Sequence, residues 1–370
     1  MKSKVLIVGG FRGGEFNTFG GIIKSCNLLV SSKIKDEFDL ILVDSTQISN
    51  PPPNLLIRFL IFLRRFSNFI FNLIFKRPNI VLVFSSEGLS GLEKGLMISI
   101  SYYLGTPSII FPRAGKLIEQ VANSKTMHFL IKTMYSKASV FLCQAETMKE
   151  FAITKLNIPT SKVKILNNWT ATSDLIDLGK ERTKNYKNFN NNKLLFVGWL
   201  ENQKGVLDLI EVFENLQKMG YDLTLTFVGK GNAERILKKI IETKNIKNVN
   251  FKGWLKNESL LKAYRDNSIF VFPSWHEGMP NAIIEALSSG LAVISTSVGE
   301  IPALVTNGCE ALLSPPKDKV LFQKNLEKVL TNYEFKKQIS ISGHNLAKSK
   351  FSTEIVLKKL SKILLQNLKK

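Results

Sequence analysis

Residues 270–302 read FVFPSWHEGMPNAIIEALSSGLAVISTSVGEIP and decide the fold class. The apolar run Ser268–Phe272 predicts a buried strand. Pro280 suits the first turn of a helix, because a backbone N–H would have no partner there, and Gly290 is a typical residue after a helix end. Leu291–Ser295 predicts a second buried strand. The order strand, loop, helix, strand is that of α/β proteins.

This stretch contains two glutamates, Glu277 in the loop and Glu285 in the helix, with seven residues between them. Alanine, isoleucine and leucine surround Glu285, which predicts a helix buried on most of its circumference. A buried carboxylate needs hydrogen-bond donors. They could come from a neighbouring element of the protein or from the hydroxyls of a bound polyol such as ribose, and the residues alone leave both open.

Length and charge limit the function classes. A chain of 370 residues predicts two domains. Lys and Arg total 51 against 30 Asp and Glu, a formal net charge of +21, which favours phosphate-bearing ligands, a membrane surface or nucleic acid. Nucleic acid is not expected, since the sequence has no helix-turn-helix, zinc or RNA-binding signature.

The cysteines and the apolar runs indicate the compartment. Cys26, Cys143 and Cys309 are isolated, which favours a reducing compartment and no disulfide framework. The N-terminal apolar run is too short for a signal peptide, and no uncharged apolar run is long enough to span a membrane. We expect a cytoplasmic protein, free or peripheral at the inner face of the plasma membrane, with no metal cluster of Cys and His.

Six apolar runs in the first half predict buried parallel strands. These runs are Val5–Val8, Asp39–Val43, Ile80–Phe84, Pro107–Phe111, Val140–Cys143 and Lys162–Leu166. The glycine-rich loop Gly9–Gly21 ends in the pair Gly20 and Gly21 before a helix, which suits phosphate binding or is only a turn. Arg113 follows a strand at the edge where α/β proteins bind ligands, so we expect it to meet a phosphate or an acceptor, or to be solvated.

Residues 54–77, NLLIRFLIFLRRFSNFIFNLIFKR, predict a basic amphipathic helix. Arg58, Arg65 and Lys76 fall near one line at helical spacing, with Arg64 beside them. A basic helix rich in Phe and Leu is typical of an interfacial membrane helix. The alternative is a helix packed on the sheet with solvated arginines. We favour contact of these four cations with an anionic membrane surface.

The second half repeats the alternation after a polar, asparagine-rich segment. Its predicted strands are Lys193–Val197, Leu223–Val228, Val249–Phe251, Ser268–Phe272 and Leu291–Ser295. Two such series predict two facing Rossmann-like domains with a ligand cleft between them. We expect domains over 1–175 and 193–350, a polar linker over 176–192, and a C-terminal helix over 351–370 that packs back toward the first domain. Lys204 precedes a helix in the first loop of the second domain, where a phosphate could bind or the lysine could be solvated.

The stretch Pro273–Pro302, with Glu277, seven residues and Glu285, resembles the signature of retaining glycosyltransferases of the group 1 type, also called family 4. These enzymes have the GT-B architecture of two facing Rossmann-like domains. The resemblance extends to FVGWLENQKG at 196–205, to FVGKG at 227–231, to Gly20 and Gly21, and to the Asn-Asn turn at Asn167. It covers most of the chain and is strongest in the second half.

The resemblance implies a role for each matched position. Glu285 would hold the ribose of a nucleotide-sugar, Glu277 would lie near the donor sugar, and Lys204 would bind the donor diphosphate. Main-chain amides near the diphosphate and sugar would come from Gly20, Gly21, Gly278, Met279 and Asn281. No metal or other cofactor is expected, because cations and helix N-termini can neutralise the leaving diphosphate.

One position departs from the family, since Trp199 stands where an arginine is usual. Lys230 or Arg113 would then compensate as a donor-binding cation, or Lys204 would act alone. We expect a metal-independent, hexosyltransferase-like enzyme that transfers sugar from a UDP- or GDP-sugar to a glycan or lipid-linked acceptor in bacterial cell-surface polysaccharide synthesis, such as capsule, O-antigen or lipopolysaccharide. Two alternatives remain: a non-catalytic basic peripheral-membrane protein of this fold, and a GT-B nucleotide-sugar epimerase.

Overall fold

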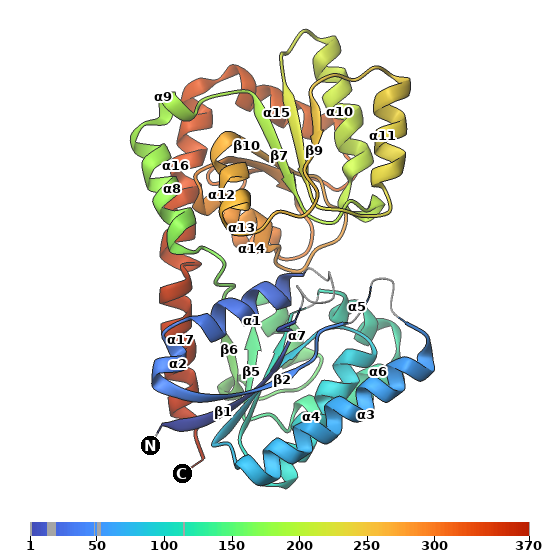
Figure 1. The fold of residues 1–370 in the computed structure, drawn as a ribbon, viewed down its shortest axis with the longest axis vertical. Coiled ribbons are helices and arrows are strands. Elements are labelled where there is room, and N and C mark those ends of the chain that lie inside the picture. The colour runs from blue at the N-terminus through green and yellow to red at the C-terminus, as the bar shows by residue number, and fades with distance from the viewer. Residues whose placement is uncertain (1, 13–19, 48, 50–52, 114, 370) are drawn as a thin grey trace. The chain divides into compact units, whose positions relative to one another are not determined.

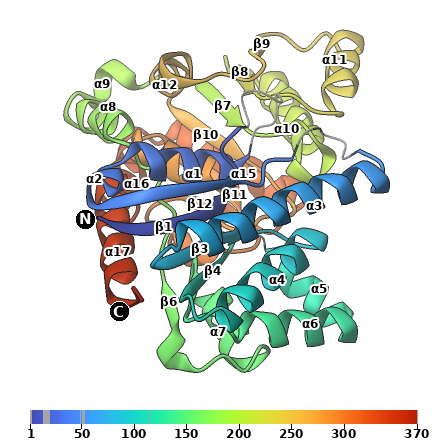
Figure 2. The same cartoon turned by 60° about the horizontal axis from the view of Figure 1, so that its bottom comes forward.

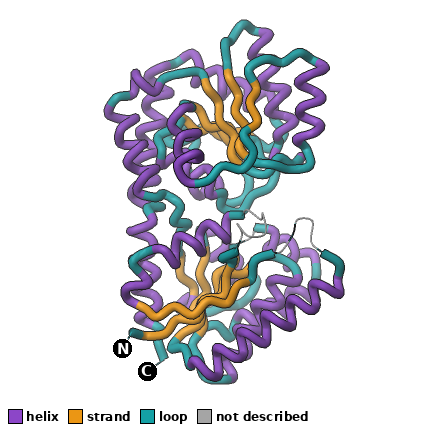
Figure 3. Tube along the Cα trace, viewed as in Figure 1, coloured by secondary structure: helices purple, strands orange, loops and turns teal. Residues whose placement is uncertain are grey.

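The computed structural model describes residues 2–12, 20–47, 49, 53–113 and 115–369, which form two compact units (Figure 1). The first unit comprises the chain up to Thr170 together with the segment from Thr353 onward, and the second comprises Ala171–Ser352. Each unit contains a six-stranded parallel sheet, and Figure 3 shows helices on both faces of each sheet. The predicted α/β class is therefore confirmed.

The first unit has the strand order β2-β1-β3-β4-β5-β6. Its strands are β1 (Ser3–Gly9), β2 (Phe38–Asp44), β3 (Ile80–Ser85), β4 (Ser108–Pro112), β5 (Val140–Cys143) and β6 (Val163–Ile165). All six correspond to predicted apolar runs. The direction of winding reverses between β1 and β3, which makes the carboxyl ends of these strands the place where such sheets bind ligands.

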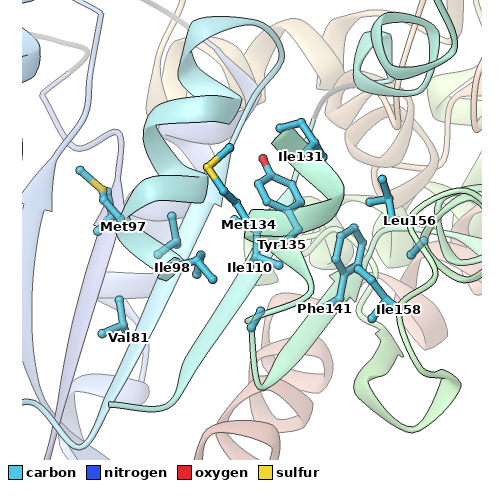
Figure 4. Packing of buried hydrophobic residues seen from close by; sticks show 14 of the residues in the cluster. Val81, Met97, Ile98, Ile110, Ile131, Met134, Tyr135, Phe141, Leu156 and Ile158 are labelled. Carbon is cyan, nitrogen blue, oxygen red and sulfur yellow. The ribbon is translucent and has the colours of Figure 1, made fainter. Parts of the chain in front are cut away.

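Helices cover both faces of this sheet. They are α1 (Gly21–Ser31), α2 (Ile34–Glu37), α3 (Leu55–Phe71) with its π-helical continuation η1 (Asn72–Lys76), α4 (Leu89–Tyr103), α5 (Lys116–Asn123), α6 (Lys125–Tyr135), α7 (Glu146–Thr154), the short η2 (Thr160–Lys162) and α17 (Thr353–Gln366). On one face Met97, Met134 and Tyr135 pack in a core with sheet residues (Figure 4). On the other, Leu357 and Leu360 of α17 pack with β1 and β3.

The second unit has the order β12-β11-β10-β7-β8-β9, the doubly wound order of dinucleotide-binding folds. Its strands are β7 (Lys193–Val197), β8 (Thr224–Val228), β9 (Val249–Phe251), β10 (Ile269–Phe272), β11 (Ala292–Thr296) and β12 (Leu312–Ser314). Its helices are α8 (Ser173–Lys184), α9 (Tyr186–Phe189), η3 (Asn202–Lys204), α10 (Val206–Lys218), α11 (Glu234–Thr243), α12 (Asn257–Asp266), α13 (Asn281–Ser288), α14 (Ile301–Leu304), α15 (Lys319–Thr331) and α16 (Tyr333–Lys350). Only β12 was not predicted among its strands.

The expected polar linker over 176–192 is wrong. Most of this segment is helical, in α8 and α9, and belongs to the second unit. Leu175, Leu178 and Arg182 recur three and four residues apart and are all buried. The composition of the segment is polar, but its few apolar residues lie on one helix face and supply the burial that a helix needs.

Candidate functional site

Two loops meet where the winding of the second sheet reverses. Residues 198–205 follow β7 and residues 273–280 follow β10, its neighbour in the sheet. Trp275 N–H donates to the Gln203 carbonyl at 2.8 Å. Gly205 has a φ of 67°, and a Cβ there would lie 2.0 Å from the Pro273 carbonyl oxygen. Only glycine at position 205 therefore allows the backbones of the two loops to come this close.

Lys204 and Glu277 are brought together by these loops. Lys204 Nζ donates to Glu277 Oε1 at 2.5 Å, and the side chains are 19% and 9% exposed. Lys204 ends the turn η3, and Gly205 separates it from α10. An ammonium has three N–H donors, so this bond leaves two for another acceptor. A charge-assisted hydrogen bond at the reversal point of the sheet is an arrangement that suits an anionic ligand.

Glu285 lies in α13 and is 3% exposed, as predicted for a buried helix. Tyr264 of α12 donates its hydroxyl to Glu285 Oε2 at 3.1 Å. Burial, and then the neighbouring carboxylate, raise the pKa of Tyr264 well above its usual value, so the phenol stays a donor. The bond from Tyr264 is thus one contact of a carboxylate that has about four acceptor positions. Both readings of Glu285 remain compatible with this geometry.

Arg182 of α8 holds the ends of the two helices that bear Tyr264 and Glu285. Its Nε donates to the Ser289 carbonyl at 2.9 Å, just beyond α13. Its Nη1 and Nη2 donate to the carbonyls of Asn267 and Tyr264 at 2.9 and 2.8 Å, at the end of α12. The final carbonyls of a helix lack partners and carry partial negative charge. A buried cation there therefore fastens α12 to α13, and burial lowers the pKa of Arg182 to about 10.

Trp199 and Trp254 form an aromatic pair at the same edge of the sheet. Trp199 follows β7 and Trp254 follows β9, and their rings meet edge to face with centroids 4.9 Å apart. Both are partly exposed. Lys230, exposed at the end of β8, accepts a backbone hydrogen bond from Leu200 at 3.0 Å. The position where the family has an arginine is thus apolar and lies beside a lysine from the next strand.

The loop before α13 is contacted by the turn at Gly299 and Glu300, which was not identified from the sequence as part of the site. Gly299 has a φ of 57°, and a Cβ there would lie 2.0 Å from the Glu277 carbonyl oxygen. Glu300 N–H donates to the Gly278 carbonyl at 3.1 Å. Met279 is buried and Asn281 begins α13. Residues 298–302, VGEIP, the last part of the signature stretch, support the Glu277 loop through these contacts.

The remaining predicted site residues belong to the first unit. Gly20 is exposed and precedes Gly21, the first residue of α1, while residues 13–19 of the glycine-rich loop lie outside the described residues. Arg113 is not a solvated loop residue, so that alternative is wrong. Its guanidinium lies 5.0 Å from the Phe111 ring and 5.1 Å from the Trp169 ring, and Nη2 donates to Ser25 Oγ at 2.9 Å. Burial lowers the pKa of Arg113 to about 10.

The predicted membrane cations separate into two groups. Arg58, Arg64 and Lys76 are exposed on α3 and η1. Arg65 instead points inward, where its Nη1 donates at 3.0 Å to both carboxylate oxygens of Glu93 on α4. Membrane contact through Arg65 is therefore wrong, because the buried Glu93 pairs with it. In the described part of the chain, no group of Cys, His, Asp and Glu could hold a metal ion, and no helix is long and apolar enough to cross a membrane.

Comparisons with known proteins agree with this fold. The family model of glycosyl transferases group 1 matches residues 179–345. The capsular polysaccharide biosynthesis glycosyltransferase CapM of Staphylococcus aureus is 25% identical over 281 residues, which are 73% of this chain and 74% of CapM. The uncharacterized glycosyltransferase MJ1059 of Methanocaldococcus jannaschii is 32% identical over 177 residues, 47% of this chain, and the chain spans 43% of its length.

Solved structures match the chain over almost its whole length. Sucrose-phosphate synthase from Thermosynechococcus elongatus has a TM-score of 0.74 at 14% identity and covers 99% of both chains. Anabaena HepE in complex with UDP has a TM-score of 0.72 at 13% identity, covers 99% of this chain and all of that one, and has also been solved with UDP-glucose. Residues 179–345 are thus similar to the group 1 glycosyltransferases, and the whole chain has the GT-B fold of these solved structures.

Proposed function

We propose that this protein is a retaining, metal-independent, hexosyltransferase-like glycosyltransferase that transfers a sugar from a UDP- or GDP-sugar to a glycan or lipid-linked acceptor. The observation that supports it best is the Lys204–Glu277 pair at the reversal point of the second sheet, where doubly wound folds bind nucleotides. The buried Glu285 lies on the helix that follows the same loop. The second unit would be the donor domain and the first the acceptor domain.

Each of these residues has a task in the proposed reaction. Glu285 would accept hydrogen bonds from the two ribose hydroxyls, which a carboxylate can do with one oxygen each. Negative charge grows on the diphosphate as the bond to the sugar breaks, and the ammonium of Lys204 would stabilise it. When Lys204 binds the diphosphate, Glu277 Oε1 becomes available to orient the hydroxyls of the donor sugar. No metal ion is needed for these roles.

The relatives suggest the substrate class. HepE was solved with UDP and UDP-glucose, and CapM is named for capsular polysaccharide biosynthesis. For this chain we accordingly propose a nucleoside-diphosphate sugar donor and a bacterial cell-surface polysaccharide acceptor, such as capsule, O-antigen or lipopolysaccharide. The enzyme would act in the cytoplasm, and a lipid-linked acceptor would bring it to the inner face of the plasma membrane.

A non-catalytic binding protein of this fold is the second candidate, and Trp199 favours it because one cation usual in the family is absent. Thermal unfolding separates the two. A donor-binding enzyme gains stability with UDP or GDP by about 2.7 kcal/mol at a hundredfold excess over the dissociation constant. A pure membrane adaptor would show no such gain.

Lys204→Ala tests the enzyme directly. We expect it to lower sugar transfer, or hydrolysis of the donor in the absence of acceptor, by about 10²- to 10³-fold, because it removes the cation opposite the developing charge. Lys239→Ala, which removes an exposed lysine from α11 of the same unit, is the matched control and should leave the rate unchanged. Full activity in the Lys204 variant, with both variants folded, would refute the proposed role.

A further inference from the structure

The outward face of helix α3 is apolar, although it is exposed. Leu56, Leu60, Leu63 and Phe71 recur three, four or eight residues apart and are 42–68% exposed. We call these four residues the α3 stripe. On η1, Ile74 and Phe75 are exposed as well. A surface helix of a globular protein normally turns polar residues outward, so this helix differs from the usual pattern.

The inward face of α3 is apolar too. Phe69 is fully buried, and Phe66 and Ile70 pack against the core of the first unit. This packing fixes the rotation of the helix, so that the α3 stripe cannot turn inward without exposing Phe69. Figure 2 shows α3 running along the outside of its unit. Contiguous exposed apolar residues of this kind mark an interaction surface.

Charge around the stripe has a single sign. From Ser45 to Ser86 the sequence contains no Asp or Glu. The basic residues of this segment are Arg58, Arg64, Arg65, Lys76 and Arg77. Arg65 is paired with Glu93, which also binds Lys94, while the other four are exposed and form no ion pair among the described residues. The apolar stripe is therefore flanked by unpaired cations.

We propose that the α3 stripe and its flanking cations bind the surface of an anionic lipid bilayer. Leucine and phenylalanine side chains would enter the boundary between headgroups and acyl chains, and the arginines would bind lipid phosphates. The positive charge of this surface favours one binding partner over another. A second copy of this chain would place two faces of like charge against each other, which is unfavourable, whereas an anionic bilayer complements both the cations and the apolar stripe.

The proposal concerns the first unit and does not depend on the proposed transferase activity. The test uses the full chain and sedimentation with vesicles of phosphatidylcholine, either pure or containing about one-third phosphatidylglycerol. We expect binding to the anionic vesicles that is stronger by about fivefold for each cation engaged. The difference should shrink as salt is added, because the cations are exposed. Absence of binding to the anionic vesicles overturns the proposal.

The triple variant Leu56→Gln, Leu60→Gln, Leu63→Gln tests the apolar part. All three side chains are exposed, so the variant should melt at the wild-type temperature, and we expect its binding to both kinds of vesicle to fall at least tenfold. The matched control replaces three apolar residues of similar exposure on other helices. It consists of Ile236→Gln, Val320→Gln and Ile355→Gln. Equal binding by the two triple variants would overturn the proposal.

The double variant Arg58→Gln, Arg64→Gln tests the charge. We expect a loss of about 25-fold on anionic vesicles and little change on pure phosphatidylcholine. Lys239→Gln, Lys324→Gln removes the same charge from exposed sites on the second unit and should bind almost as the wild type does. If the leucine variant instead abolishes self-association of the protein without lipid, the occupant is a second copy and the bilayer proposal is wrong. None of these assays contains a nucleotide-sugar, so their failure would leave the proposed transferase untouched.

Discussion

Replacing Arg182 should loosen the two helices that carry Tyr264 and Glu285. Arg182→Met keeps most of the side-chain volume and removes every donor. In the native protein three of its N–H groups donate at 2.8–2.9 Å to carbonyls beyond or within the last turns of α12 and α13. In the variant these carbonyls are left buried beside an apolar side chain, where water does not replace the lost donors.

The expected loss in the free energy of unfolding follows from the number and kind of hydrogen bonds that Arg182 makes. A hydrogen bond from a charged donor contributes about 1.5–3 kcal/mol, and the cost of bringing the guanidinium out of water offsets part of this. We therefore expect the free energy of unfolding of the second unit to fall by about 3–5 kcal/mol. Arg182→Lys keeps a charge but not the planar guanidinium that donates to four carbonyls, and should lose roughly half as much stability.

Urea unfolding followed by tryptophan fluorescence measures the effect. Trp199, Trp254 and Trp275 all lie in the second unit, so this signal reports mainly on that unit. The control is Arg265→Met on α12, which breaks an exposed pair with Glu181 at 3.0 Å and should cost less than about 1 kcal/mol. Affinity for UDP should also fall in the Arg182 variant, since α13 positions Glu285. Equal losses in the two variants would refute the assigned role of Arg182.

Two further predictions concern packing and pH. Gly179→Ala should destabilise the second unit by about 3 kcal/mol in the same urea assay, because its Cβ would lie 2.0 Å from the Ser288 carbonyl oxygen and 2.3 Å from His344 Nδ1. Gly198→Ala in the same unit, where the new Cβ would come no closer than 3.4 Å to another atom, should cost almost nothing. Burial lowers the pKa of Lys94 to about 8, below its unfolded value of about 10.4, so the unfolded chain binds more protons between these values. The stability of the wild type relative to Lys94→Met, measured in thermal melts, should therefore rise between pH 8 and pH 10. A stability difference that stays constant over this pH range would contradict the lowered pKa of Lys94.

The sheets were predictable from the sequence because their strands are continuous apolar runs that end at glycine, proline or serine. Val5–Val8 before Gly9 and Phe270–Phe272 before Pro273 are examples, and both are fully or almost fully buried. β12, Leu312–Ser314, was missed, whereas the equally short β9, Val249–Phe251, was predicted. The sequence did not predict the order of the strands; the repetition of strand and helix predicted parallel sheets, which are restricted to few topologies.

The partners of buried charges were not predictable. Arg182 serves carbonyls more than eighty residues further along the chain, and nothing in the spacing of those residues marks an acceptor. Arg65 has the same sequence environment as Arg64, yet only Arg65 reaches Glu93. A signal existed for α8 itself, because Leu175, Leu178 and Arg182 recur at helical spacing. The mostly polar composition of residues 176–192 concealed this helical pattern.

In the proposed donor site, Trp199 takes the place of a cation that is usual in the family. Trp199 packs against Trp254, and the side chain of Lys230 runs past Gly253 with its Cε 3.3 Å from the position of a Cβ there. The Lys230 side chain therefore lies beside Gly253, whereas Lys204 is held at Glu277. If no second cation reaches the diphosphate, Lys204 and main-chain amides would have to neutralise most of the diphosphate charge. Loss of Lys204 should then be more severe here than in relatives that keep the arginine, and Trp199→Arg should restore part of the activity lost in Lys204→Ala.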